Sequence, residues 1–95
     1  MRRGWTQGKE KMKENPYLKS AIFEVVETQL RTNDPPETRQ TFDRLISEGY
    51  SAEDSKKLIG CVVVAEIFEV VKKQETFSPE RFAKALRELP KLPQD

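Results

Sequence analysis

An apolar run occupies the middle of the chain, from Leu58 to Val71, and leaves few folds open to it. It reads LIGCVVVAEIFEVV, and eleven of its fourteen residues are apolar, the exceptions being Gly60, Glu66 and Glu69. Its valines and isoleucines favour a strand. Its length favours a helix instead, because strands usually stop at about 8 residues and this pattern continues further.

The charged residues within and after the run also favour a helix. Glu66, Glu69 and Lys73 follow one another at spacings of three and four, which places them on one helical stripe. A helix that is apolar on nearly every other side needs several neighbours to cover it. We therefore expect a buried central helix over about residues 52–73. The run is too short and too interrupted to span a membrane, which takes about 20 apolar residues.

Capping residues mark the first and second helices. Asparagine is a strong N-cap and proline is favoured at the first helical position, so Asn15 and Pro16 should begin the first helix. That helix should end before Asp34 and Pro35, because a residue that precedes proline is pushed out of the helical region. Asp34 and Glu37 have the spacing of a capping box, which predicts the start of the second helix.

A glycine and a serine predict a tight connection between the second helix and the central one. Gly49 fits the left-handed position after a helix, and Tyr50 is then placed to pack back on Leu45, as in a Schellman motif. Ser51 fits the N-cap of the central helix. Within that helix, Gly60 costs about 1 kcal/mol relative to alanine. We expect it to mark the close approach of another helix.

The last helix has equally clear limits. Ser78 is the expected N-cap and Pro79 the first helical residue, while Phe77 and Phe82 have the spacing of a hydrophobic staple. Pro90 should end regular structure. The sequence therefore predicts an all-α, compact four-helix domain over residues 15–92.

The amino-terminal segment, residues 1–14, differs from the rest. It has five basic and two acidic side chains, no apolar period and two glycines, whereas the whole chain has a net charge of only +1. We expect a basic, mobile arm, because termini are seldom ordered without anchors. Trp5 among the basic residues leaves open weak nucleic-acid binding, although the overall charge makes it unlikely as the main function.

The chain lacks the residues of the commonest active sites. It has no histidine, which removes the commonest general base and metal ligand, and it has one cysteine. A single cysteine fits a reducing cytoplasm. Because Cys61 falls inside the apolar run, we expect it to be a small core residue. No enzymatic activity and no cofactor is expected.

Several short motifs, in this order and spacing, resemble a small all-helical bacterial domain family that has no assigned activity. The resemblance covers about residues 15–92. It is carried by Asn15-Pro16-Tyr17-Leu18, Glu27-x-Gln29-Leu30, Asp34-Pro35-Pro36-Glu37, Gly49-Tyr50, Ile59-Gly60, Ala65-Glu66-Ile67-Phe68, and Phe77-x-x-Glu80-Arg81-Phe82 through Leu89-Pro90.

The resemblance implies a metal site near Glu27 and Glu66, built with histidines that this chain does not have. The family's histidine positions are occupied here by Lys19, Phe23, Glu53 and Lys57. Only Glu27, Gln29 and Glu66 remain of the polar set, so the metal is expected to be lost. Lysines could instead neutralise the glutamates as an ion-pair cluster.

Three functions follow as hypotheses. The first is a non-enzymatic structural or protein-interaction module, homo-oligomeric through the first helix and the central helix. Charged residues make up 35% of the chain against an average of about 25%, so the core is small and association would help to stabilise it. The second is a degenerate metal- or small-ligand site formed by Glu27, Gln29, Glu66, Lys19 and Lys57. The third is the weak nucleic-acid binding of the arm.

Overall fold

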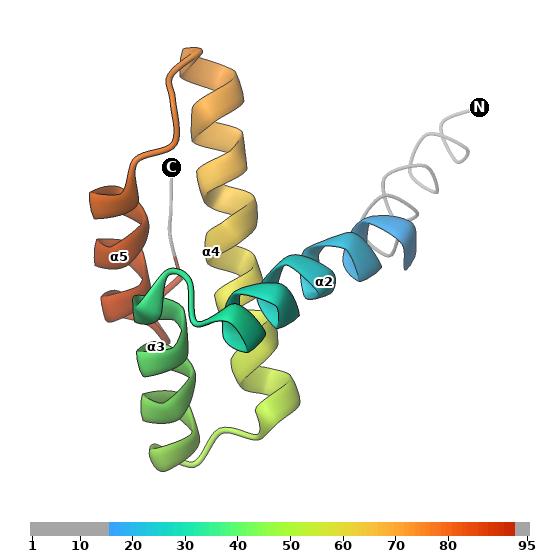
Figure 1. The fold of residues 1–95 in the computed structure, drawn as a ribbon, viewed down its shortest axis with the longest axis vertical. Coiled ribbons are helices and arrows are strands. Elements are labelled where there is room, and N and C mark those ends of the chain that lie inside the picture. The colour runs from blue at the N-terminus through green and yellow to red at the C-terminus, as the bar shows by residue number, and fades with distance from the viewer. Residues whose placement is uncertain (1–15, 93–95) are drawn as a thin grey trace, which may run out of the picture.

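The structure is a computed structural model that describes residues 16–92. These residues form four helices and no strand: α2 (Pro16–Thr32), α3 (Pro36–Ser47), α4 (Ala52–Lys73) and α5 (Pro79–Glu88) (Figure 1). The expected all-α four-helix domain is confirmed, and so are the limits of α4. The expected arm at residues 1–14 and the N-cap at Asn15 lie outside the described residues.

The helices are arranged around α4 and α3. Each of these two helices contacts the other three, whereas α2 and α5 do not contact each other. Figure 1 shows α4 as the long upright element, with α3 and α5 along one side of it and α2 crossing it and projecting to the other side. No helix in the described part of the chain is long and apolar enough to cross a membrane.

All four helices contribute to a small apolar core. Its members are less than a tenth exposed, and burial of each such side chain stabilises the fold by about 1.5–3 kcal/mol. They are Val26, Leu30, Leu45, Ile59, Val62, Val63, Phe82, Leu86 and Leu89. Because the members from α4 lie between residues 59 and 63, the core surrounds the middle of that helix rather than its whole length.

The connection between α3 and α4 has the predicted Schellman geometry. Gly49 has a φ of 105°, in the left-handed region that suits glycine. The Gly49 N–H donates to the Ile46 carbonyl at 3.0 Å, and the Tyr50 N–H donates to the Leu45 carbonyl at 3.1 Å. Tyr50 packs against the core. Ser51 then caps α4, its hydroxyl accepting a hydrogen bond from the Asp54 N–H at 3.0 Å.

The predicted start of α5 is confirmed as well. The Ser78 hydroxyl accepts a hydrogen bond from the Arg81 N–H at 3.2 Å. The rings of Phe77 and Phe82 lie 5.7 Å apart and are tilted by 57°. This is the contact expected of a hydrophobic staple, and it fixes the direction in which the chain enters α5.

The predicted capping box at the start of α3 is wrong. The N-cap is Pro35, one residue later than expected, and no side chain caps this helix. The shift places Asp34 and Glu37 out of register for reciprocal capping. The Asp34 N–H instead donates to the Gln29 carbonyl at 3.1 Å, which closes the carboxyl end of α2.

Gly60 marks the close approach that the sequence predicted. A Cβ atom built on Gly60 would lie 3.1 Å from the Cγ2 atom of Ile22, inside ordinary van der Waals contact. The missing side chain therefore lets α2 cross directly over α4 at this point.

The expected burial of Cys61 is wrong. Its side chain is exposed, because successive helical residues are turned by about 100° and Cys61 faces away from the core formed by Ile59 and Val63. The apolar run is therefore not buried all round: one side of it faces the core, and the other side is exposed to solvent.

Candidate functional site

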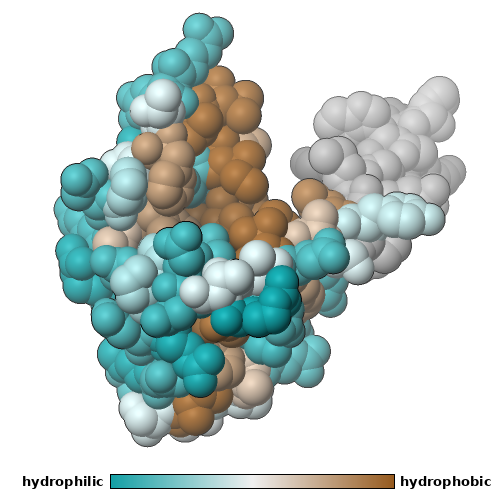
Figure 2. All heavy atoms as spheres, in the orientation of Figure 1, coloured by the Kyte–Doolittle hydropathy of each residue, from teal (hydrophilic) through white to brown (hydrophobic). Residues whose placement is uncertain are grey.

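Apolar side chains remain exposed on α4 from Cys61 to the carboxyl end of the helix. Figure 2 shows them as a continuous apolar surface on that helix, extending to the hollow between α4 and α2. We call this set the α4 stripe, and its members recur at helical spacings on one side of the helix: Cys61, Val64, Ile67, Phe68 and Val71. Phe68 is 67% exposed and Val71 is 69% exposed.

The arrangement of the helices explains why the stripe is uncovered. α2 contacts α4 where Ile22 meets Gly60, and beyond that crossing it projects away from α4 (Figure 1). α5 packs on a different side of α4, the side that carries Glu66, which pairs with Arg81 of α5. No described helix therefore lies over the side of α4 that carries Phe68 and Val71.

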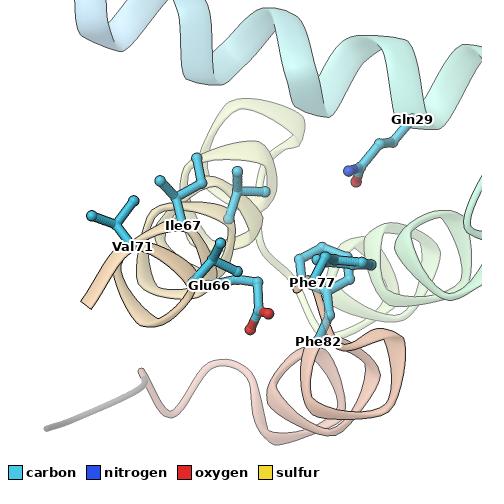
Figure 3. A pocket seen from close by; sticks show the side chains of 8 residues that line it. Gln29, Glu66, Ile67, Val71, Phe77 and Phe82 are labelled. Carbon is cyan, nitrogen blue, oxygen red and sulfur yellow. The ribbon is translucent and has the colours of Figure 1, made fainter. Parts of the chain in front are cut away.

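An open groove of about 270 Å³ adjoins the α4 stripe and shares Ile67 and Val71 with it. It lies between α4, the carboxyl end of α2 and the start of α5. Figure 3 shows the side chains that form it. Six of the lining residues are apolar and two are polar: Val63, Ile67, Val70, Val71, Phe77 and Phe82, with Gln29 and Glu66. The groove is thus predominantly apolar, which is typical of sites that bind an apolar partner.

Gln29 brings an amide group to the groove from α2. Its Oε1 atom accepts a hydrogen bond from the Thr38 hydroxyl at 2.8 Å. This bond joins α2 to α3 and satisfies the acceptor of a half-buried side chain. Among residues 16–92 no partner is assigned to the amide nitrogen, which is therefore left to solvent or to a bound group.

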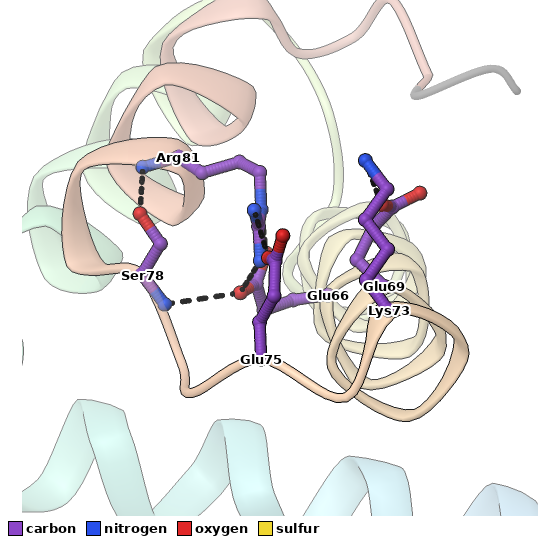
Figure 4. A network of polar contacts seen from close by, with 6 residues as sticks. All are labelled: Glu66, Glu69, Lys73, Glu75, Ser78 and Arg81. Carbon is purple, nitrogen blue, oxygen red and sulfur yellow. Dashed lines mark hydrogen bonds and ion pairs between the residues drawn. The ribbon is translucent and has the colours of Figure 1, made fainter.

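Glu66 brings a buried carboxylate, but Arg81 and Ser78 occupy both of its oxygens (Figure 4). It accepts from Nε of Arg81 at 2.9 Å, from Nη2 of Arg81 at 2.8 Å and from the Ser78 N–H at 3.2 Å. The hydrogen bonds from Arg81 are the main reason why the pKa of Glu66 is lowered, against the opposing effect of burial. A carboxylate held in this way is a poor general base and a poor metal ligand.

Arg81 extends this network to the loop before α5. Its Nη1 atom donates to Glu75 at 3.1 Å, and its hydrogen bonds to Glu66 and Glu75 raise the pKa of the guanidinium. On the neighbouring turn of α4, Glu69 pairs with Lys73 at 3.0 Å, and this hydrogen bond lowers the pKa of Glu69. The charges around the groove are thus paired internally.

The structure brings together two of the five predicted site residues, Gln29 and Glu66. Glu27 lies away from the groove and pairs with Lys56 at 2.6 Å. Lys57 pairs weakly with Glu53 on its own helix at 3.9 Å. Lys19 is exposed on α2.

The two glutamates are neutralised within the chain, but not by the suggested lysines, Lys19 and Lys57. Lys56 neutralises Glu27, and Arg81 neutralises Glu66. Within residues 16–92 no three carboxylate or thiol groups lie close enough together to hold a metal ion. The described residues therefore give no geometric support to a metal site.

The groove includes two aromatic residues whose part in a site the sequence does not indicate. Phe77 and Phe82 were recognised as a staple, but not as one wall of a groove. The sequence gives no signal for this, because the exposure of Phe77, 51%, is known only from the structure. Phe77 becomes informative only together with the neighbouring exposed side chains of α4, because contiguous apolar patches, and not single exposed residues, mark binding surfaces.

Fold and site together define an all-helical domain with an open apolar groove and an uncovered apolar stripe. Comparisons with family models, with curated proteins and with solved structures found no match for this chain. The resemblance to a bacterial domain family therefore stays a prediction.

Proposed function

We propose that this chain is a non-enzymatic interaction module that pairs with a second copy of itself. The pairing surface consists of the α4 stripe, the adjoining groove, and Val25 on the exposed side of α2. The observation that carries the proposal is the uncovered second half of α4, where large apolar side chains face solvent in a chain whose core is otherwise small.

The size of the surface suits a pair of identical chains. The exposed parts of the large apolar side chains on this surface amount to about 500–600 Å², taking about 150–200 Å² for each fully exposed side chain. They are Val25, Val64, Ile67, Phe68, Val71 and Phe77. This is at the upper limit for the largest patch on a monomer, about 300–600 Å². With a polar rim it approaches the roughly 800 Å² that each partner buries in a stable complex.

The electrostatics permit two copies to meet on this surface. Glu66, the one buried carboxylate of the groove, is neutralised by Arg81. Pairing therefore leaves no unpaired charge of the groove in an apolar interface, which would be costly. The net charge of +1 also produces little repulsion between two copies.

The proposal is tested by placing a charge on the stripe. Val64→Lys introduces an ammonium group at a position that is 42% exposed in the single chain, so the fold should tolerate it. The matched control is Ile46→Lys on α3, at a position that is 40% exposed and lies outside the stripe and the groove. Both variants are compared with the wild type by size-exclusion chromatography with light scattering, and circular dichroism checks the helix content.

We expect a dimer mass for the wild type and for Ile46→Lys, and a monomer mass for Val64→Lys. Burying an unpaired ammonium group costs several kcal/mol, which is enough to abolish a moderate association. A dimer that persists in Val64→Lys with unchanged affinity contradicts the proposed surface.

A further inference from the structure

After Val71, Phe68 is the most exposed side chain of the α4 stripe. Its ring lies at the same height along α4 as the groove. The groove residues of α4 run from Val63 to Val71, and Phe68 falls within that range. Because each helical residue is turned by about 100° from the one before it, Phe68 lies a little over a third of a turn around α4 from the middle of the groove. A projecting ring and a hollow thus lie side by side across one helix.

Because the Phe68 ring and the groove lie at the same height on α4, two copies can make the same ring-to-groove contact twice in a symmetric pair. In a two-fold symmetric pair, if residue i of one copy contacts residue j of the other, then j of the first contacts i of the second. A two-fold axis that runs along α4 exchanges the two edges of its exposed face while keeping their height. It therefore places each ring opposite the groove of the other copy.

We propose that Phe68 of each copy inserts into the groove of the other copy, so that each site is completed by its partner. This inference rests on the pairing proposed above and names the side chain that anchors it. Since α2 already crosses α4 at Gly60, the two α4 helices can meet only along their carboxyl-terminal halves. The two-fold axis must therefore be inclined to α4, so that the two helices diverge towards their amino ends.

The groove has the volume and chemistry to take a phenyl ring. Its volume is about 270 Å³, and an apolar cavity of about 150 Å³ already holds benzene. The tilted rings of Phe77 and Phe82 form one wall, and a third ring can pack edge-to-face or offset against them. Buried aromatic anchors of this kind supply most of the binding energy in many interfaces.

The test is complementation between two variants that each lose one half of the contact. Phe68→Ala removes the ring but keeps the groove open. Val71→Trp keeps the ring but fills the groove, and a position that is 69% exposed tolerates the larger side chain. Each variant alone retains neither of the two insertions, whereas a mixed pair retains one: the Phe68 of Val71→Trp in the open groove of Phe68→Ala.

Native mass spectrometry of an equimolar mixture measures the fraction of mixed pairs, because the variants differ in mass. We expect each variant alone to associate at least tenfold more weakly than the wild type. In the mixture we expect mixed pairs well above one half of all pairs, the fraction that random exchange gives. In the control mixture, Ile46→Ala replaces Phe68→Ala. Pairs of Ile46→Ala then keep two insertions, pairs of Val71→Trp keep none, and mixed pairs keep one. Mixed pairs are therefore not favoured over the average of the two, and their fraction should not exceed one half.

The outcomes separate this inference from the proposed function. A wild type that pairs, with a mixture at or below one half, overturns the insertion of Phe68 and leaves the pairing surface standing. A wild type that does not pair overturns both. Circular dichroism of each variant shows that weak association comes from the contact and not from loss of the fold.

Discussion

Substitution of Gly60 tests the crossing of α2 over α4, on which the exposure of the stripe depends. Alanine in place of glycine in a helix interior normally stabilises by about 1 kcal/mol. Here the new Cβ atom would lie 3.1 Å from Cγ2 of Ile22. That methyl is attached to a β-branched carbon with one preferred rotamer in a helix, so it cannot turn aside. The overlap should cost about 1–3 kcal/mol, and we expect Gly60→Ala to destabilise by about 1 kcal/mol.

A double-mutant cycle isolates the contact between these two residues. Ile22→Ala removes the Cγ2 methyl and should itself destabilise by about 1–2 kcal/mol, since Ile22 is half-buried against the core. In that background Gly60→Ala should stabilise by about 1 kcal/mol, which gives a coupling of about 2 kcal/mol. The matched control is Ile22→Val, which keeps Cγ2, so that Gly60→Ala should remain unfavourable.

Urea unfolding followed by far-ultraviolet circular dichroism measures these free energies. All variants should be compared at one low micromolar concentration, because association couples stability to concentration. If Gly60→Ala stabilises the wild type by the full helix-propensity gain of about 1 kcal/mol, α2 does not cross α4 at Gly60 and the reasoning is refuted.

Three further predictions concern single side chains. Ser55 is fully buried and its hydroxyl has no hydrogen-bond partner, so Ser55→Ala should stabilise by about 1 kcal/mol in the same urea assay, and a loss of stability would show a missed partner. Ser51→Ala removes the cap of α4 and should destabilise by about 1 kcal/mol, whereas Ser47→Ala, at the exposed end of α3, should cost less. The pKa of Glu66 is lowered on folding; its contribution to stability is therefore complete above the unfolded pKa near 4.5 and is lost as the pH falls through the lower folded value. Glu66→Gln should accordingly be less stable than the wild type at pH 7, with a difference that shrinks as the pH falls below about 4.5; a difference independent of pH would contradict the charged pairing with Arg81.

The limits of the helices follow closely from local sequence signals. Ser51, Ser78 and Gly49 predict a cap or an ending because the stabilising bond lies within a few residues. Gly60 also predicts a contact between helices, because glycine is unfavourable inside a helix and usually stands there where another helix packs closely. The start of α3 was wrong by one residue because two consecutive prolines fit more than one register.

The exposure of α4 could not be predicted from the sequence. A run that is apolar on nearly every side indicates a helix with several covered faces, but it does not say which face a neighbour leaves open. Whether Phe68 is covered depends on where α2 crosses, and that is fixed by the fit between Ile22 and Gly60. The expected excess of apolar surface on the first and central helices agrees with the exposed residues on α2 and α4.

The partners of the candidate site residues were also beyond sequence reasoning. Glu66 was expected to pair with a lysine or to hold a ligand, and it pairs with Arg81, fifteen residues further along the chain. Glu27 pairs with Lys56 rather than with the neighbouring Lys57. These pairings depend on the rotation of α5 and α2 about α4, and one residue of rotation moves a side chain by about 100°.

Sedimentation equilibrium of the wild-type chain measures directly whether two copies pair. Samples from about 1 to about 200 micromolar cover the range of dissociation constants typical of weak to moderate complexes. The apparent mass should rise with concentration from the chain mass of 11.0 kDa towards twice that value. A mass that stays at 11.0 kDa over the whole range contradicts the account.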